Sequence, residues 1–116
     1  QYGIDKDRDI DYFLIHQANQ MINKLIQKRL KVDDDHCPYN IADFGNTSST
    51  TIPLMIVNKL KESIGGKKVV ACGFGTGLAW GAIYFNVDNN LKVVDLLHYI
   101  GSSFCSNEKE NSNYWW

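Results

Sequence analysis

The sequence predicts an α/β fold in which a mixed sheet is packed with helices and ends in an antiparallel, glycine-rich hairpin. Two observations support this fold class. Short apolar runs, which suit buried strands, alternate with segments whose apolar residues recur at helical spacing. Later in the chain, two strand-like runs are separated only by a short glycine-rich turn, which favours antiparallel pairing. The length of 116 residues corresponds to one domain.

The first predicted strand and helix flank a histidine. Residues 1–11 are charged and are expected to form a connector, whereas Tyr12–Ile15 is a continuously apolar run typical of a buried strand. Helical spacing follows, with an apolar face of Ala18, Ile22, Leu25, Ile26 and Leu30 and a solvent face of Asn23, Lys24, Gln27 and Lys28. His16 therefore lies at the carboxyl end of a strand, a common place for functional groups in α/β proteins.

Two loops are expected in the middle of the chain. Residues 33–38 are acidic and end in proline, which indicates a loop. Residues 40–49 have turn chemistry throughout, and we expect unusual backbone angles at Gly45 and Asn46.

A second helix is expected after these loops. It should begin near Thr51–Pro53, because proline fits a first helical turn and either Ser49 or Thr50 can cap it. The pair Gly65-Gly66 should end it. Its predicted apolar face consists of Leu54, Ile56, Val57, Leu60 and Ile64.

The predicted hairpin joins a strand at Lys68–Cys72 to a strand at Leu78–Val87. Residues 88–90 should form a turn, and residues 91–100 fit a strand and a helix equally well. Residues 101–113 are expected to be mobile.

We therefore divide the chain into a structured segment, residues 1–90, and a partly mobile C-terminal extension, residues 91–116. The chain does not begin with Met, so we expect it to be a piece of a longer protein.

Composition excludes several function classes. Hydrophobic residues make up 44% and charged residues 22%, which is ordinary for a globular protein. The formal net charge of -1 gives no basic footprint for nucleic acid, and no apolar stretch is long enough to cross a membrane. The three cysteines lack metal-ligand spacing, so we expect reduced thiols in a cytoplasmic protein.

Three motifs follow one another at similar distances. The string IHQAN contains His16, the string YNIADFGNTSS contains Asn46 thirty residues later, and GFGTGLAWG begins at Gly73. Taken singly, each is better explained as a structural histidine, a turn asparagine or a tight turn. The glycine segment also lacks the lysine of a phosphate-binding loop. Together, an imidazole, a carboxamide and a flexible turn suit the binding of a developing oxyanion.

With these motifs the chain resembles the condensing enzymes of the thiolase fold, specifically the 3-oxoacyl-(acyl-carrier-protein) synthase III group. IHQAN resembles the histidine motif of that group, NIADFGNTSSTTIPL its asparagine motif, and VVACGFGTGLAWGAIYF its closing hairpin, over about residues 9–87. The resemblance implies a thiolase-like C-terminal half. The half-domain of the family has a strand and a helix before the histidine motif, so the fold should be incomplete. We expect an exposed apolar sheet face or edge and a homodimer.

The resemblance also implies a reaction, the decarboxylative Claisen condensation of fatty-acid biosynthesis. A malonyl thioester loses carbon dioxide, and the resulting enolate attacks an acyl group held on a cysteine. His16 and Asn46 are implied to donate to the enolate oxygen, which requires neutral His16 with its hydrogen on Nε2. A second oxyanion site is implied at the backbone of Gly75 and Thr76, with Phe74 near the nucleophile. The thioesters are carried on coenzyme A or acyl carrier protein, and no cofactor is implied.

The residues after His16 correspond to the family's carrier-protein contact segment, which here is Gln17, Ala18, Asn19, Gln20 and Met21. Met21 stands where the family often has a basic residue, and Lys24 or Lys28 could substitute for it. For Asn19, contact with the pantetheine arm and capping of the helix remain open.

None of Cys37, Cys72 and Cys105 has the helix N-terminal setting that activates a nucleophilic thiol. The nucleophile is therefore expected in an N-terminal half outside this sequence, and the chain alone is expected to be inactive. Two alternatives remain. One is a related coenzyme A-dependent acyltransferase or ketide synthase, and the other is a non-catalytic partner with the same fold.

Overall fold

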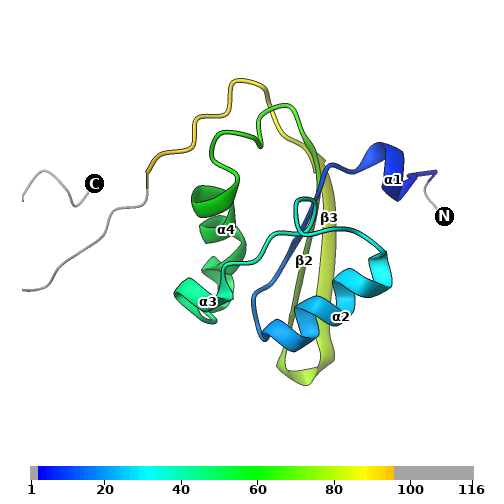
Figure 1. The fold of residues 1–116 in the computed structure, drawn as a ribbon, viewed down its shortest axis with the longest axis vertical. Coiled ribbons are helices and arrows are strands. Elements are labelled where there is room, and N and C mark those ends of the chain that lie inside the picture. The colour runs from blue at the N-terminus through cyan, green and yellow to red at the C-terminus, as the bar shows by residue number, and fades with distance from the viewer. Residues whose placement is uncertain (1–2, 96–116) are drawn as a thin grey trace, which may run out of the picture.

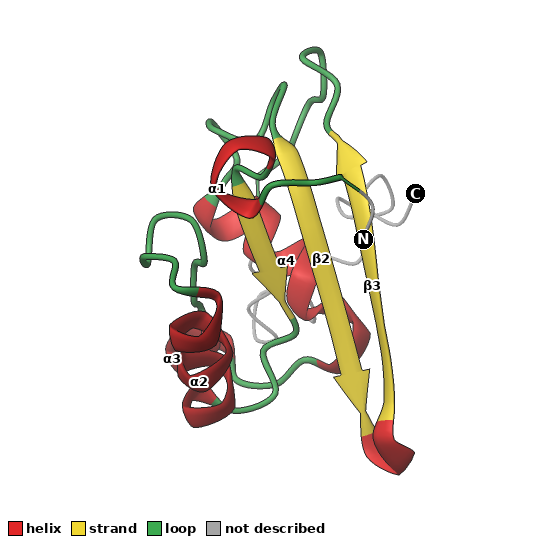
Figure 2. Ribbon diagram, turned by 90° about the vertical axis from the view of Figure 1, so that its right-hand side faces the viewer, coloured by secondary structure: helices red, strands yellow, loops and turns green. Residues whose placement is uncertain are grey.

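The computed structural model describes residues 3–95, which form a mixed sheet with helices on both faces (Figures 1 and 2). The strands are β1 (Tyr12–Ile15), β2 (Lys68–Gly75) and β3 (Ala79–Asn86). The helices are α1 (Lys6–Asp9), α2 (Gln20–Leu30), α3 (Ile41–Phe44) and α4 (Thr51–Lys59), and short 3₁₀ turns lie at Ser48–Thr50 and Thr76–Leu78.

The strand order β1-β2-β3 confirms the predicted mixed sheet and hairpin. β1 runs parallel to β2, because the chain crosses over through α2 and α4 between them, and β2 pairs antiparallel with β3 across a tight turn. The register places Ile15 opposite Cys72 and Gly73 opposite Gly81. His16, the next residue after Ile15, therefore lies beside the middle of β2.

Both faces of β1 are buried, which explains its unbroken apolar sequence. Leu14 packs under α4 in one cluster with Met55, Leu60, Ile64, Val69 and Ala71. Phe13 and Ile15 pack on the opposite face in a second cluster with Cys37, against Ile26 and Leu30 of α2. Figure 1 shows the sheet nearly edge-on between α4 and α2.

The two faces of α2 differ from the prediction. Asn23, which we placed in solvent, is completely buried, whereas Ile22 and Leu25 of the predicted apolar face are exposed. Asn23, Ile26 and Leu30 stand at positions i, i+3 and i+7 and so share one stripe of the helix. Its Nδ2 donates to the carbonyl oxygen of His16 at 3.2 Å, whereas its buried Oδ1 has no partner among the described residues.

Two segments predicted as irregular contain short helices. The connector holds α1, which begins where the Asp5 side chain accepts a hydrogen bond from the backbone N–H of Asp7. Residues 40–49 hold α3 and the start of a 3₁₀ turn. Unusual backbone angles occur at Gly45 (φ 65°) as predicted, and at Ser48 (φ 59°) rather than at Asn46. The loop prediction for residues 33–38 is confirmed.

α4 begins at Thr51 as predicted, although the Thr50 side chain makes no capping bond there. The helix ends at Lys59, well before Gly65-Gly66, so this part of the prediction is wrong. The chain leaves the helix at Leu60, and the backbone N–H of Ile64 then bonds to the Leu60 carbonyl at 2.9 Å. This turn returns Ile64 to the core. The apolar residues therefore keep their helical spacing up to Ile64, although the helix itself has ended.

Replacement of Gly66 by alanine is expected to lower the free energy of unfolding by about 1–2 kcal/mol. Gly66 has a φ of 72°, and an added Cβ would lie 2.0 Å from Oδ1 of Asn89. Urea denaturation of the purified chain measures the loss. Gly65→Ala is the matched control, because its nearest new contact is an ordinary 3.4 Å from Asn89 O. Equal losses in the two variants would contradict this backbone explanation.

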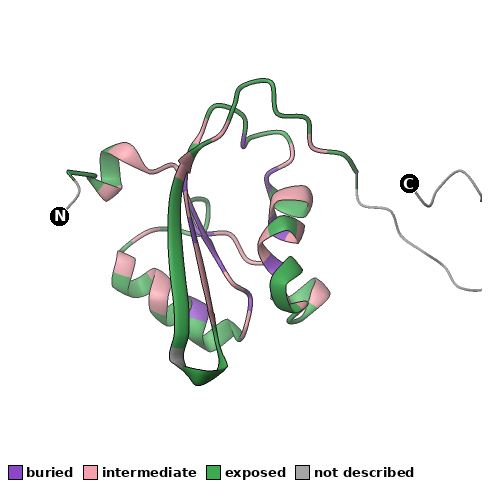
Figure 3. Cartoon of the chain, turned by 180° about the vertical axis from the view of Figure 1, so that it is seen from behind, coloured by how far each residue is buried: buried purple, intermediate pink, exposed green. Residues whose placement is uncertain are grey.

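β3 is an exposed edge of the sheet. Figure 3 shows it exposed along almost its whole length, while β1 behind it is buried. Trp80 is 79% exposed and Ile83 is 64% exposed, and the strand has neither a charged residue nor a proline to protect it. The expected exposed apolar edge is therefore present in the part of the chain that the structure describes.

The segment after β3 returns over α4. Val87 and Val93 pack against the core cluster that contains Leu14 and Met55, and Lys61 forms an ion pair with Asp95. Residues 91–95 have no regular secondary structure. The predictions for residues 96–113 lie outside the described residues, and the division at residue 90 stays a prediction. Within residues 3–95, no helix is both long enough and apolar enough to span a bilayer.

Candidate functional site

The backbone of His16 is fixed at the end of β1 by three hydrogen bonds. Its N–H donates to the carbonyl oxygen of Cys72 at 2.9 Å, which extends the β1–β2 ladder by one residue. Its own carbonyl accepts from the N–H of Ala18 at 3.0 Å and from Nδ2 of buried Asn23 at 3.2 Å. The histidine is thus held where strand passes into helix, as the sequence predicted.

The imidazole of His16 lies between α4 and the end of β2. Nδ1 is 2.6 Å from Oγ1 of Thr51, the first residue of α4. Phe74 packs against the ring edge to face, with 5.4 Å between the ring centroids and 76° between the planes. These contacts use Nδ1 and leave Nε2 for a ligand. The sequence indicated Thr51 only as the start of a helix, so its contact with His16 was not predicted.

Asn46 lies exposed in the loop that leads into α4. Its Oδ1 accepts a hydrogen bond from the backbone N–H of Ser48 at 2.9 Å. A backbone N–H can only donate, so the amide oxygen must face Ser48 and Nδ2 must face away. Among the described residues Nδ2 has no partner, which leaves it as a donor. The predicted convergence of His16 and Asn46 on one oxygen stays a prediction.

The expected carrier-contact segment divides into a buried residue and an accessible group. Gln17 is only 1% exposed, with Nε2 donating to Ile15 O at 2.7 Å and Oε1 accepting from the N–H of Asn40 at 3.4 Å. Its side chain braces the loop from inside, so we revise the predicted contact for this residue. Gln17 was misassigned because its place in the motif does not reveal burial.

The other four residues of that segment are accessible. Asn19, Gln20 and Met21 are exposed and Ala18 is partly exposed. The Asn19 side chain accepts from the N–H of Met21 at 2.8 Å, so it caps α2, which was one of the two predicted roles. Its Nδ2 has no partner among the described residues, and carrier contact by these four residues stays a prediction.

The glycine-rich hairpin ends in an exposed turn. Gly75 and Thr76 are both exposed, and Gly77 has a φ of 81°, which suits only glycine there. An added Cβ at Gly73, Gly75 or Gly77 would meet nothing within 4 Å. Among the described residues, therefore, nothing packs closely against these three glycines. The backbone oxyanion site at Gly75 and Thr76 stays a prediction.

Neither described cysteine is activated. Burial, reinforced by nearby Asp34, raises the pKa of the Cys37 thiol to about 11, and burial also raises the pKa of Cys72. A nucleophilic thiol needs a lowered pKa, so neither buried Cys37 nor half-buried Cys72 is activated for attack. This supports the prediction that the nucleophile lies elsewhere. Cys105 lies outside the described residues.

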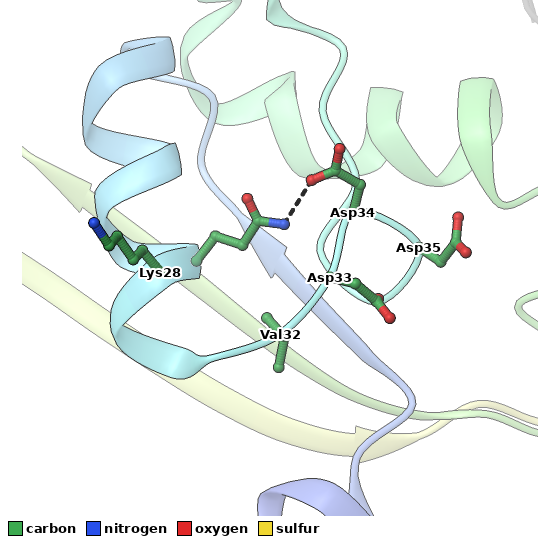
Figure 4. Close-up of a pocket in the computed structure, with 6 residues that line it drawn as sticks. Lys28, Val32, Asp33, Asp34 and Asp35 are labelled. Atoms are coloured by element: carbon green, nitrogen blue, oxygen red, sulfur yellow. Dashed lines mark hydrogen bonds between the residues drawn. The ribbon is translucent and has the colours of Figure 1, made fainter.

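One hollow on the surface lies away from His16. It has a volume of about 500 Å³ and lies between α2 and the acidic loop (Figure 4). Gln27 Nε2 donates there to Asp34 Oδ1 at 2.7 Å, while Asp33 and Asp35 point away from that bond (Figure 4). In residues 3–95 no three His, Cys, Asp or Glu side chains are arranged to hold a metal ion. A functional site at His16 stays a prediction, which rests on the contacts of its side chain with Thr51 and Phe74.

Comparison with known proteins identifies the family of the chain. Residues 3–87 match the family model described as 3-oxoacyl-[acyl-carrier-protein (ACP)] synthase III C terminal. The beta-ketoacyl-[acyl-carrier-protein] synthase III of Acaryochloris marina is 46% identical over 82 residues, which cover 69% of this chain and 25% of that protein. Its counterpart in Streptococcus gordonii is 39% identical over 83 residues, covering 68% and 26%.

Solved structures agree as well. The 3-oxoacyl-(acyl-carrier protein) synthase of Burkholderia xenovorans superposes with a TM-score of 0.72 and 37% identity, over 80% of this chain and 27% of that one. The synthase III of Pseudomonas aeruginosa gives a TM-score of 0.63 and 33% identity, over 69% and 25%. This chain thus spans about a quarter of the length of these proteins.

The mixed sheet, its closing hairpin and the histidine at the end of β1 define the class of protein: a segment of a thiolase-like fold. The likeness is close enough for a narrower assignment. The chain belongs to the family of 3-oxoacyl-[acyl-carrier-protein] synthase III C-terminal domains.

Proposed function

We propose that this chain supplies the enolate-binding donors of a decarboxylating condensing enzyme that extends acyl chains. The observation that carries the proposal is that Nε2 of His16 and Nδ2 of Asn46 have no partner among the described residues. Each side chain is anchored at its other end, so each donor is held in place before a substrate arrives. Preorganised donors of this kind stabilise a developing oxyanion more than water does.

The reaction proposed is a Claisen condensation. The C–C bond to the carboxylate of a malonyl thioester breaks, carbon dioxide leaves, and the electron pair spreads onto the thioester oxygen as an enolate. The enolate carbon then attacks the carbonyl of an acyl-cysteine, and the cysteine thiolate leaves. His16 and Asn46 bind the enolate oxygen, while the backbone at Gly75 and Thr76 contributes to a second oxyanion site on the acyl-cysteine.

The cysteine belongs to a part of the protein outside this sequence. Loss of contact with water raises the pKa of buried Cys37 and of half-buried Cys72, so neither supports acyl transfer. We infer that the 116-residue chain alone is inactive. No metal or organic cofactor is needed, because the charge that develops is held by hydrogen-bond donors.

The proposed substrates and partners are acyl and malonyl thioesters carried on coenzyme A or acyl carrier protein. The accessible start of α2 supports contact with a carrier, since Met21 is 78% exposed and exposed Lys24 and Lys28 follow one and two turns later. Those lysines complement an acidic partner. We further propose that the protein is a cytoplasmic homodimer.

A chimera tests the proposal. Residues 3–87 replace the matching segment of the Acaryochloris marina synthase, to which this chain is 46% identical. We expect the chimera both to acylate its cysteine and to release carbon dioxide from a malonyl thioester, whereas the isolated chain does neither. Mass spectrometry follows the first step and radiolabelled carbon dioxide the second.

The same assay separates the alternatives. A chimera that acylates but never releases carbon dioxide would favour a coenzyme A-dependent acyltransferase. A folded chimera inactive in both steps would favour a non-catalytic partner.

A further inference from the structure

We propose that Thr51 is a positioning residue that keeps the single hydrogen of the neutral His16 imidazole on Nε2. The proposal rests on the proposed function and deepens it, because only this tautomer presents a donor to the enolate. The geometry that points to it is one contact: Oγ1 of Thr51 lies 2.6 Å from Nδ1 of His16. Thr51 is 2% exposed, so water does not compete for that hydroxyl.

Two arrangements of hydrogens fit this contact. In the first, the Thr51 hydroxyl donates to Nδ1, and the ring carries its hydrogen on Nε2. In the second, Nδ1–H donates to Oγ1, and the hydroxyl hydrogen of Thr51 must find another acceptor. A threonine hydroxyl has one hydrogen to donate, so these arrangements exclude each other.

The surroundings of Thr51 favour the first arrangement. A threonine in a helix can direct its hydroxyl to the carbonyl four residues earlier, which here is Thr47 O. That oxygen already accepts from the N–H of Thr50 at 3.3 Å and from Oγ1 of Thr50 at 2.7 Å. Among the described residues the Thr51 hydroxyl has no acceptor other than His16. The second arrangement would bury an unsatisfied donor, which costs free energy that the first does not.

A second contact also restricts the orientation of the His16 ring. Phe74 packs edge to face against it, and the backbone of His16 is bonded to Cys72 and Asn23. The first residue of α4 therefore determines the protonation pattern of a histidine at the end of β1. Through this contact Thr51 acts on the reaction without touching the substrate.

The hydrogen on the ring can be located by ¹⁵N NMR of the purified 116-residue chain. At about pH 8.5, where histidine side chains are neutral, the two ring nitrogens of His16 give separable signals. We expect a protonated signal from Nε2 and an unprotonated, hydrogen-bonded signal from Nδ1. A ring that carries its hydrogen on Nδ1 would overturn the inference, and this reading needs no variant.

Three variants complete the test. Thr51→Val removes the hydroxyl at nearly constant volume, and we expect the Nδ1 signal to shift towards that of a nitrogen without a donor. Thr51→Ser restores the hydroxyl and should restore the native signal, and Ser49→Ala, which removes an exposed hydroxyl two residues away, should leave it unchanged. An unchanged Nδ1 signal in folded Thr51→Val would overturn the inference. No substrate is present, so failure here is distinct from failure of the decarboxylation assay.

Discussion

Replacement of His16 by alanine in the chimera is expected to slow release of carbon dioxide from a malonyl thioester by about a hundred- to a thousand-fold. Loss of one preorganised oxyanion donor has an effect of this size in other enzymes. The enolate oxygen would keep the Asn46 donor but lose the donor at Nε2 of His16. Single-turnover release of radiolabelled carbon dioxide measures the step without interference from product release.

Acylation of the cysteine in the same variant should fall much less, because the enolate donors do not take part in that step. This split between the two half-reactions distinguishes a lost donor from a misfolded protein. His36→Ala is the matched control. It removes an exposed imidazole from the acidic loop, and we expect both half-reactions to remain near the starting rate. If His16→Ala left decarboxylation unchanged, the role assigned to His16 would be wrong.

His16→Gln sharpens this prediction. Glutamine offers a neutral N–H donor but no basic nitrogen, so it should retain more decarboxylation than alanine if donation is the function. If His16 acted instead as a general base, the glutamine and alanine variants would be equally inactive.

The sequence predicted the sheet well because strands depend on local pattern and on short connections. The apolar run Tyr12–Ile15 specifies β1, and the glycine-rich segment between Cys72 and Leu78 specifies a hairpin, although β2 continues to Gly75, three residues beyond its predicted end. The end of α4 was predicted poorly for a related reason. Apolar spacing continued through Ile64, but it reflects burial of that segment, and burial does not require a helix.

The polar interior was the part that the sequence could not supply. Asn23 and Gln17 are hydrophilic residues that are buried because each bonds to backbone near His16, a contact between segments that pattern alone does not reveal. Thr51 is likewise a buried polar residue whose partner, His16, could not be predicted, because thirty-five residues separate the two in sequence. Motif order located His16 and Asn46, whereas the residues that orient His16 required coordinates.

Replacement of Asn46 by aspartate is expected to reduce decarboxylation by about a thousand-fold, at the upper end of the effect of losing one donor. Aspartate has the shape of asparagine and can still accept the hydrogen bond from the N–H of Ser48. It would, however, place a carboxylate oxygen where Nδ2 donates, so the developing enolate would meet a negative charge instead of a donor.

The charge itself is controlled by Asn58→Asp, which makes the same change on the exposed surface of α4. We expect that variant to release carbon dioxide at nearly the starting rate, and we expect Asn46→Ala to fall between it and Asn46→Asp. An Asn46→Asp variant that was faster than Asn46→Ala would contradict the proposed donor role.

The dependence of the rates on salt adds a second measurement. Salt weakens the repulsion between the carboxylate and the enolate only if the site is open to solvent. The ratio of the carbon dioxide release rates of the aspartate and alanine variants, measured at low and high ionic strength, would then show how far the rest of the enzyme closes over the exposed Asn46.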